Sequence, residues 1–299
     1  MEQNLTHRPA EKSTIETSIL GKITIARYRF QLIATQKTAL PCYKGSAFHG
    51  GFGHALRQIA PTWYQHLFEP EKSAAHFNPD FKPPDKSAWP KPFVLLPPLD
   101  EQQGYAPGES FYCEITLFGH AIQHFPVCHA ALEYLGSQMG LGRDQGRFKI
   151  EHVEEAKTNT SRPPVNPQQI TLHFPTRLRL KSNNRLCRNE LPFKLFFERL
   201  IGRLNTLALF YGEGEIIDHT QRRALLEHAE KITIKKDDLH WQEWDRFSGR
   251  QKAWMKFGGL LGEITYEGDL EPFIPYLTLG EWVHIGGKTS FGLGKYEVR

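Results

Sequence analysis

The sequence is poor in cysteine and has no long hydrophobic run. Only 4 of its 299 residues are cysteine, and none form a Cys-x-x-Cys pair, which argues against a disulfide framework and against a zinc finger. No segment approaches the roughly 18 consecutive apolar residues of a membrane-spanning helix, and the mean hydropathy is −0.48. The polar residues 1–22 lack the apolar core of a secretory signal. We therefore expect a soluble, cytoplasmic protein.

Charge is nearly balanced overall but uneven along the chain. The 37 basic and 33 acidic residues leave a net charge of +4. Between Thr176 and Asn205, however, eight basic residues stand against two acidic ones, a local excess of six. Such a strip attracts polyanions, of which nucleic acid is the commonest. The alternative is a solvated face whose charge is balanced by acidic residues elsewhere in the fold.

The two halves of the chain resemble each other. Glu-Ile-Thr-Leu-Phe-Gly at 114–119 recurs as Glu-Ile-Thr-Tyr-Glu-Gly at 263–268, an offset of 149 residues. Each copy is followed by an aromatic residue and a proline, a short helical pattern, a glycine-rich turn and a final strand. This periodicity indicates a duplicated unit of about half the chain.

The first parts of the two halves also correspond. Residues 23–34 and 170–180 alternate as strands do, and each is followed by a helical pattern, over 45–59 and 191–211. Each half is therefore β-α-β-α-β with room for a further strand, which is the ferredoxin-like plan that RNA-recognition domains also use. We predict an α+β protein of two tandem ferredoxin-like (RRM-like) domains with a C-terminal glycine-rich loop.

Composition suggests where the domains begin and end. Three prolines in 161–169 predict a linker between an N-terminal domain over 19–160 and a C-terminal domain over 170–299. A proline-rich insertion is expected at about 70–110. The polar residues 1–18 are predicted to form a flexible tail.

The glycine-rich segment 286–294 is the most distinctive part of the second half. Closely spaced glycines let backbone N–H groups approach an anion, and flanking lysines add positive charge. The Gly287-Lys288-Thr289 triplet is not a nucleotide-binding P-loop, because that motif requires glycine where Trp282 stands and a helix where a strand is expected. A tight turn leading into an edge strand is the alternative.

Four ordered stretches resemble a known family. They are LPCYKGSAFHGGFGHALRQ (40–58), FVLLPP (93–98) with the following GESFYCEITLFG (108–119), WDRFSGRQKAWMKFGGLLGEI (244–264) and HIGGKTSFGLGKYEV (284–298). Together they resemble the RAMP superfamily, and most of all the CRISPR-associated endoribonucleases that process precursor CRISPR RNA. The resemblance implies two ferredoxin-like domains and cleavage of repeat RNA without metal or other cofactor, leaving a 2′,3′-cyclic phosphate and a 5′-OH.

The resemblance also suggests where catalytic residues lie. Cleavage by the RNA's own 2′-OH requires a base, an acid and a group that stabilises the extra charge of the transition state, roles that suit histidine and lysine. Family members usually carry a catalytic histidine at or near the first helix. Here that region offers four candidates: His54, His49, Tyr43 and Lys44. The two histidines are about 140° apart on a helix, so we expect at most one to be the base. His284 is a third candidate, and a structural role is the alternative for each.

Predicted RNA-binding residues surround the glycine-rich loop and the expected groove between the domains. Those of the loop are Gly286, Gly287, Lys288, Ser290, Gly292, Gly294 and Lys295. Those before the third strand of the second half are Arg246, Arg250, Gln251 and Lys252. Arg143 and Arg147 flank the glycine turn of the first half. Each arginine has a surface salt bridge as its alternative. Trp241, Trp244 or Trp254 could stack a base.

A metal site is not expected. His120, His124, Cys128 and His129 lie close in sequence, but Pro126 and the loop-like context disfavour a tetrahedral site. The expected partner is precursor CRISPR RNA, with a CRISPR effector complex as a further candidate, and the protein is expected to be a monomer or a homodimer. The alternatives are a non-catalytic RAMP subunit that binds guide RNA, and a two-domain RNA-binding protein unrelated to CRISPR.

Overall fold

The computed structural model describes residues 21–73, 89–156, 166–248 and 253–299, and for residues 245–255 it describes no side chains. The predicted tail, residues 74–88 of the proline-rich insertion and part of the predicted linker therefore lie outside the described residues. Within the described residues, no helix has the length and apolar character needed to cross a membrane.

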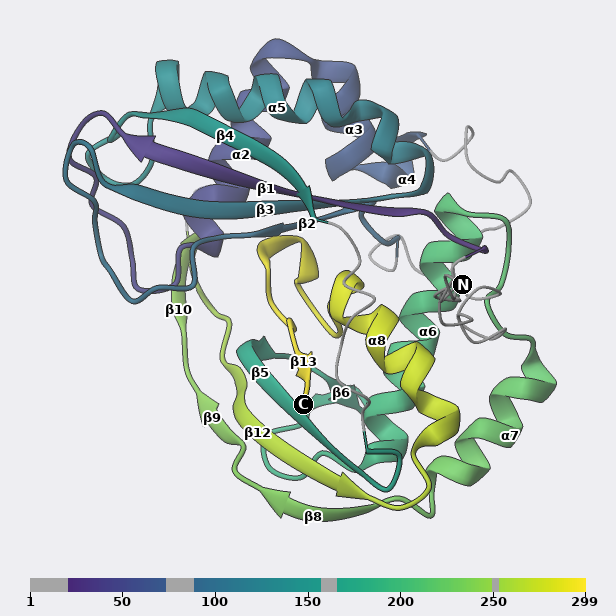
Figure 1. The fold of residues 1–299 in the computed structure, drawn as a ribbon. Helices are drawn as coiled ribbons and strands as arrows, with labels where there is room; N and C mark the ends of the chain where they lie inside the picture. Colours follow the sequence, from purple (N-terminus) through teal and green to yellow (C-terminus); the bar gives the residue numbers. More distant parts are fainter. Residues whose placement is uncertain (1–20, 74–88, 157–165, 249–252) are drawn as a thin grey trace, which may run out of the picture.

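The N-terminal half is one antiparallel sheet with helices packed on one face (Figure 1). The sheet order is β2-β3-β1-β4, with β1 in the centre pairing both β3 and β4. Phe30 and Leu32 of β1 are fully buried beneath the helices, whereas alternate residues such as Arg29 point to the other face. The elements are β1 (Ile25–Ala34), α2 (Gly45–Ile59), α3 (Pro61–Phe68), α4 (Pro70–Ser73), β2 (Phe93–Leu96), β3 (Ser110–Phe118), the short 3-10 segment η3 (Gly119–His124), α5 (Phe125–Tyr134), a π-helical turn η4 (Leu135–Met139) and β4 (Phe148–Ala156).

The C-terminal half repeats this topology. Its sheet order is β13-β5-β12-β8, which is the same arrangement of fourth, first, third and second strands. The elements are β5 (Gln169–Leu178), β6 (Lys181–Ser182), β7 (Arg185–Leu186), α6 (Phe193–Tyr211), α7 (His219–Ala229), β8 (Thr233–Asp237), β9 (His240–Gln242), β10 (Asp245–Ser248), β11 (Ala253–Lys256), β12 (Gly259–Glu267), η5 (Glu271–Phe273), α8 (Ile274–Val283), η6 (Thr289–Phe291) and β13 (Glu297–Val298).

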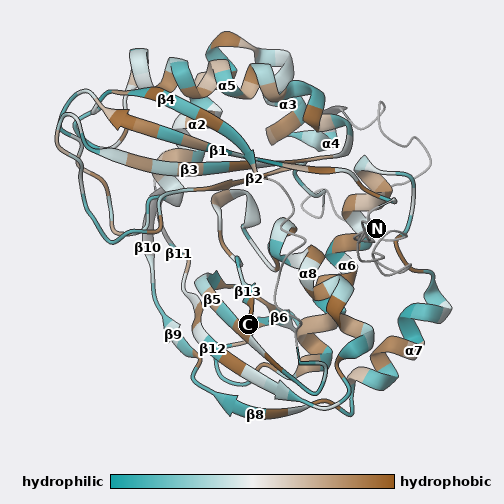
Figure 2. Cartoon of the chain, viewed as in Figure 1, coloured by the Kyte–Doolittle hydropathy of each residue, from teal (hydrophilic) through white to brown (hydrophobic). Residues whose placement is uncertain are grey.

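These two sheets confirm the predicted tandem ferredoxin-like fold. The repeated Glu-Ile-Thr segments lie in β3 and β12, the third strand of each domain, so the sequence repeat marks equivalent positions. The sequence did not predict α7, which begins with a capping box between Asp218 and Gln221. Most of α7 and the outer strand β9 carry hydrophilic residues (Figure 2).

Each domain is built on an apolar core, that of the second domain also takes in Ile23, Val94 and Phe118 of the first, and a third, smaller cluster joins the domains at the glycine-rich loop. Tyr43 of the N-terminal half packs with Phe257, Phe291 and Leu293 of the C-terminal half, and Trp244 lies against this group. The two domains are therefore connected by buried apolar contact at the glycine-rich loop as well as by the chain.

A second junction between the domains depends on Gly119. Its φ is +55°, and a Cβ atom there would lie 1.5 Å from the carbonyl oxygen of Tyr211 at the end of α6. Gly108 also has a positive φ, +91°, but has no atom within 4 Å of the corresponding position. Both glycines thus have a left-handed backbone conformation, but only Gly119 of the two lies against a neighbouring residue.

We predict that Gly119→Ala lowers the free energy of unfolding by about 3 kcal/mol, because backbone strain adds to overpacking. Gly108→Ala, the control, should cost about 1 kcal/mol from strain alone. Urea denaturation followed by circular dichroism measures both. Equal losses would show that the close contact at Gly119 is relieved without cost.

Candidate functional site

The glycine-rich loop runs against the end of β5. The N–H of Gly287 donates to the carbonyl oxygen of Arg179 at 2.8 Å. Gly286 has a φ of +86°, and a Cβ atom there would lie 2.5 Å from that same oxygen. Only glycine therefore lets the loop follow this strand so closely.

The tip of the loop is inserted into the N-terminal domain. The Tyr43 hydroxyl donates to the carbonyl oxygen of Phe291 at 2.8 Å. The His49 ring of α2 stacks on the Phe291 ring, with 3.6 Å between centroids and 14° between planes. The His49 Nε2 atom lies 3.3 Å from the Ser290 Oγ atom, within hydrogen-bond distance. A histidine of the first helix is thereby positioned by two residues of the loop.

A large cleft of 2440 Å³ opens beside this contact, between α2 of the first domain and α6 and the glycine-rich loop of the second. Eight of its lining residues are lysine or arginine and one, Glu69, is acidic. A cleft with this balance concentrates a positive potential and attracts anionic ligands. The basic residues are Arg57, Lys91, Arg143, Arg179, Lys181, Arg199, Arg203 and Lys288.

Seven of the eight cations of the cleft fall into two groups, and the eighth, Lys91, donates to the carbonyl oxygen of Phe68 at 2.8 Å. Arg203 is partly buried and donates to the carbonyl oxygens of Val283 and His284 at 2.9 and 2.8 Å, and its removal from solvent lowers its pKa to about 10. Arg179 donates to the carbonyl oxygen of Gly258, and burial lowers its pKa as well. These two guanidinium groups stabilise the wall of the cleft through hydrogen bonds to backbone carbonyl oxygens. The exposed members, Arg57, Arg143, Lys181, Arg199 and Lys288, present their charge to solvent.

The two histidines of α2, of which we expect at most one to be the base, both line the cleft. His49 is 8% exposed and lies at the glycine-rich loop, whereas His54 is exposed further along the helix. The cleft extends along α2 far enough to be lined by both His49 and His54. Their different surroundings, rather than the helical angle, distinguish them.

Tyr43 and Lys44 do not line the cleft. Lys44 is fully buried, and its ammonium group lies 3.0 Å from an Asp100 carboxylate oxygen and 2.6 Å from the Asp100 carbonyl oxygen. Burial raises the pKa of the Tyr43 hydroxyl, which remains a donor to the loop. In the structure both residues support the start of α2.

The predicted binding residues are distributed over two sides of the loop. Gly286, Gly287, Lys288 and Ser290 line the cleft. Gly292, Gly294 and Lys295 do not, and burial together with nearby Arg27 lowers the pKa of Lys295. The loop thus contributes its first half to the cleft and its second half to the packing between domains.

The predicted arginines are placed less uniformly. Arg143 lines the cleft, whereas Arg147 donates to the carbonyl oxygen of Ser137. Arg246 lies in β10, where no side chain is described. Arg250, Gln251 and Lys252 lie outside the described residues.

Comparison with known proteins identifies the family. Residues 170–296 match the family model of the CRISPR-associated endoribonuclease Cas6, and residues 23–177 match that of the N-terminal domain AF_1859_N. The C-terminal domain belongs to the CRISPR-associated Cas6 endoribonuclease family.

Individual relatives of this chain are distant in sequence. An uncharacterized protein of Archaeoglobus fulgidus is 23% identical over 288 residues, covering 87% of this chain and 93% of the relative. A structure described as a Cas6 product complex superimposes with a TM-score of 0.62 at 18% identity, covering 92% of this chain and 100% of that one. Thermus thermophilus Cas6 superimposes with a TM-score of 0.59 at 16% identity, covering 93% and 99%. These structures share the fold.

Sequence reasoning missed several basic residues of the cleft. Lys181 and Arg199 belong to the positive strip between Thr176 and Asn205 but were not selected individually, because only the fold shows which members face α2. Arg57 lies on the same helix as the two histidines, a signal that was available from helical spacing.

The histidines outside the cleft have other surroundings. His284 is 1% exposed, and its Nδ1 atom lies 3.3 Å from the carbonyl oxygen of Leu293. Burial, with Lys295, Arg27 and Arg203 nearby, holds its pKa well below the ordinary value of 6.5. His120 and His124 have lowered pKa values through burial. Throughout the described ranges, no three His, Cys, Asp or Glu side chains are grouped to hold a metal ion.

We predict that stability decreases in acid partly through His284. Its depressed pKa means that below pH 6.5 the unfolded chain takes up a proton that the folded protein excludes. The free energy of unfolding should therefore fall by up to about 1.4 kcal/mol per pH unit from this group. His284→Asn, which keeps a side chain that tolerates the left-handed φ of +57°, should show a shallower loss between pH 6.5 and 5 in urea denaturation. Parallel curves for the two proteins would contradict this assignment.

Proposed function

We propose that this protein binds CRISPR repeat RNA in the basic cleft and cleaves precursor CRISPR RNA there. In this proposal the 2′-OH attacks the neighbouring phosphorus without a metal ion, leaving 2′,3′-cyclic phosphate and 5′-OH ends. The observation that carries it is the contact of His49 with Ser290 and Phe291, which sets a titratable group beside the glycine-rich loop at the basic cleft. Family membership supports the choice of RNA as the ligand.

The chemistry assigns a role to each component of the contact. An imidazole can remove the proton from a 2′-OH or protonate the departing 5′-oxygen, because its pKa is close to neutrality. The Ser290 hydroxyl can donate or accept, so it orients the His49 ring in either protonation state. Lys288, exposed two residues earlier on the loop, supplies positive charge to the phosphorane-like transition state.

His49 is the preferred general base, and His54 the second candidate. Only His49 is held by the glycine-rich loop, and catalysis benefits from a group whose geometry is fixed before the substrate binds. The exposed His54 side chain, beside Arg57 on the same helix, is better suited to contacting the RNA backbone.

We predict that His49→Ala reduces the single-turnover cleavage rate of repeat RNA by about 10²- to 10⁴-fold, the usual contribution of general acid–base catalysis. RNA affinity should change only a few-fold. Cleavage is measured in EDTA on the full chain, with a substrate carrying 2′-deoxy at the scissile nucleotide alongside.

His219→Ala is the matched control, because His219 is exposed on α7 and does not line the cleft. A large rate loss in His54→Ala but not in His49→Ala would transfer the role of base to His54. Tight binding without any cleavage would favour the non-catalytic guide-RNA-binding subunit. Cleavage of the 2′-deoxy substrate would disprove 2′-OH attack.

We predict that Lys288→Ala weakens binding of the non-cleavable 2′-deoxy repeat and reduces its salt dependence. Losing one phosphate contact with a single strand should lower the slope of log Kd against log salt concentration by about 0.7. Lys231→Ala provides the control, since Lys231 is exposed beyond α7 and away from the cleft. Fluorescence anisotropy at several salt concentrations measures both slopes, and identical slopes would exclude Lys288 from phosphate contact.

A further inference from the structure

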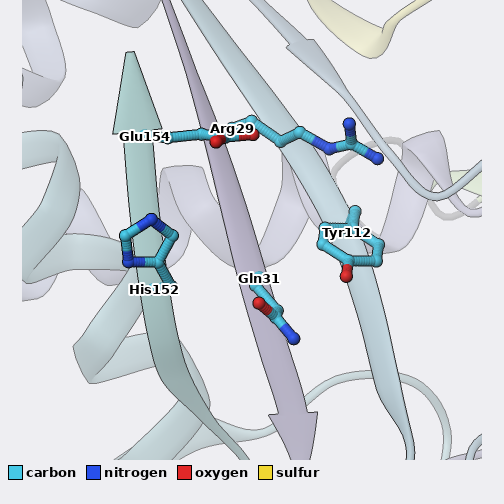
Figure 3. A pocket seen from close by; sticks show the side chains of 5 residues that line it. All are labelled: Arg29, Gln31, Tyr112, His152 and Glu154. Atoms are coloured by element: carbon cyan, nitrogen blue, oxygen red, sulfur yellow. The ribbon is translucent and has the colours of Figure 1, made fainter. Parts of the chain in front are cut away.

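The open face of the N-terminal sheet has a hollow of its own. It has a volume of 310 Å³ and is lined by five side chains from three adjacent strands, namely Arg29, Gln31, Tyr112, His152 and Glu154 (Figure 3). This face lies opposite α2 and α5, because the alternate residues Phe30 and Cys113 are buried on the helical side. The hollow is therefore separate from the basic cleft.

The register of the strands arranges these side chains in two rows. Gln31 of β1 stands between Tyr112 of β3 and His152 of β4. One step along the same face, Arg29 stands between Glu114 and Glu154. Neighbours on one face of a sheet are close enough to contact one ligand together.

The groups of the hollow are open to a ligand. Tyr112 is 40% exposed, and the Arg29 guanidinium lies over its ring with 4.5 Å between Cζ and the centroid. Glu114 is occupied by Arg27, with 3.8 Å between Nε and Oε2. In contrast, no hydrogen bond or ion pair joins the side chain of Gln31, His152 or Glu154 to another residue of the described chain.

We propose that this hollow binds one unstacked guanine base of single-stranded RNA. Tyr112 offers an aromatic surface for stacking when the Arg29 guanidinium, which lies over its ring, turns to the edge of the base. Arg29 can donate to the guanine O6 and N7 atoms, and the Glu154 carboxylate can accept from N1–H and the 2-amino group. Guanine alone among the four bases presents two acceptors on one edge and two donors on another, which matches this pair of charges.

Charge and size favour a base over a phosphate or a longer segment. Arg29 and Glu154 carry opposite charges, so the hollow lacks the positive excess of the basic cleft. Its volume is at the lower end of the range for small-ligand sites, roughly 300–1,000 Å³. One base therefore fits it better than an extended chain.

The same face leads toward the junction of the two domains. Arg27, two residues before Arg29 on β1, lies 4.3 Å from the Trp282 ring centroid of α8 and influences Lys295 electrostatically. The hollow is thus connected along β1 to the side of the glycine-rich loop that does not line the basic cleft. The inference rests on the proposed RNA-binding function, since it assigns a base-reading subsite to the same ligand.

The test uses the full chain and 2′-O-methyl hexanucleotides, which 2′-OH attack cannot cleave. Binding of UUUGUU, UUUAUU, UUUUUU and an inosine version of the first is measured by fluorescence anisotropy. Wild type should bind UUUGUU about tenfold more tightly than UUUUUU, the discrimination of one bidentate contact. Inosine, which lacks the 2-amino group, should lose about half of that preference on a logarithmic scale.

Variants assign the preference to the hollow. Tyr112→Ala should weaken UUUGUU binding at least about fivefold, because the aromatic ring that stacks the base is lost. Tyr112→Phe keeps the ring and should bind UUUGUU as wild type does. Glu154→Gln should abolish the difference between guanine and inosine. Glu133→Gln, the same change at an exposed position of α5 on the other side of the sheet, should behave as wild type.

Two results would overturn the inference. One is a wild type without guanine preference, including one that binds no hexanucleotide. The other is wild-type behaviour of Tyr112→Ala in UUUGUU binding or of Glu154→Gln in the difference between guanine and inosine. Cleavage of repeat RNA is scored separately. A protein that cleaves but shows no guanine preference retains the proposed function and loses the inference. A protein that prefers guanine through Tyr112 and Glu154 but does not cleave repeat RNA retains the inference and loses the proposed cleavage activity.

Discussion

The insertion of the glycine-rich loop into the N-terminal domain is the contact on which the rest of the structure depends. Tyr43 holds the loop by a buried hydrogen bond to Phe291, and His49 stacks on the same residue. This contact joins the two domains, forms one end of the basic cleft and orients the candidate base. Its glycines have a structural reason, because the loop lies against β5 too closely for a side chain at Gly286.

The fold could be predicted from the sequence because its signals are local and repeated. The alternating pattern over 23–34, the helical spacing over 45–59 and the Glu-Ile-Thr repeat each correspond to an observed element or pair of elements. The strands β8 to β11 lacked such a signal. Residues 233–237 are exposed throughout, so no burial alternation distinguishes that strand from a loop.

The candidate site was predictable only in part, because its residues come from distant segments. Chemical type suggested His49 and the loop, but residue type alone does not distinguish a catalytic lysine from a buried one. Lys44 has the right chemistry and sequence position, yet its ammonium group forms an ion pair with Asp100. Conversely, Arg199 had no local motif and faces the cleft only because α6 presents that side.

The contacts of the loop also determine when the site can form. Tyr43 and Phe291 are 248 positions apart, and His49 and Ser290 are 241 apart. Contacts of such high sequence separation form late, since a long loop must close before they contribute. On the ribosome, the first domain is complete long before the loop emerges. A nascent chain therefore carries the candidate base before it carries the residues that orient it, so any nuclease activity at this site would begin only after the glycine-rich loop has emerged and docked.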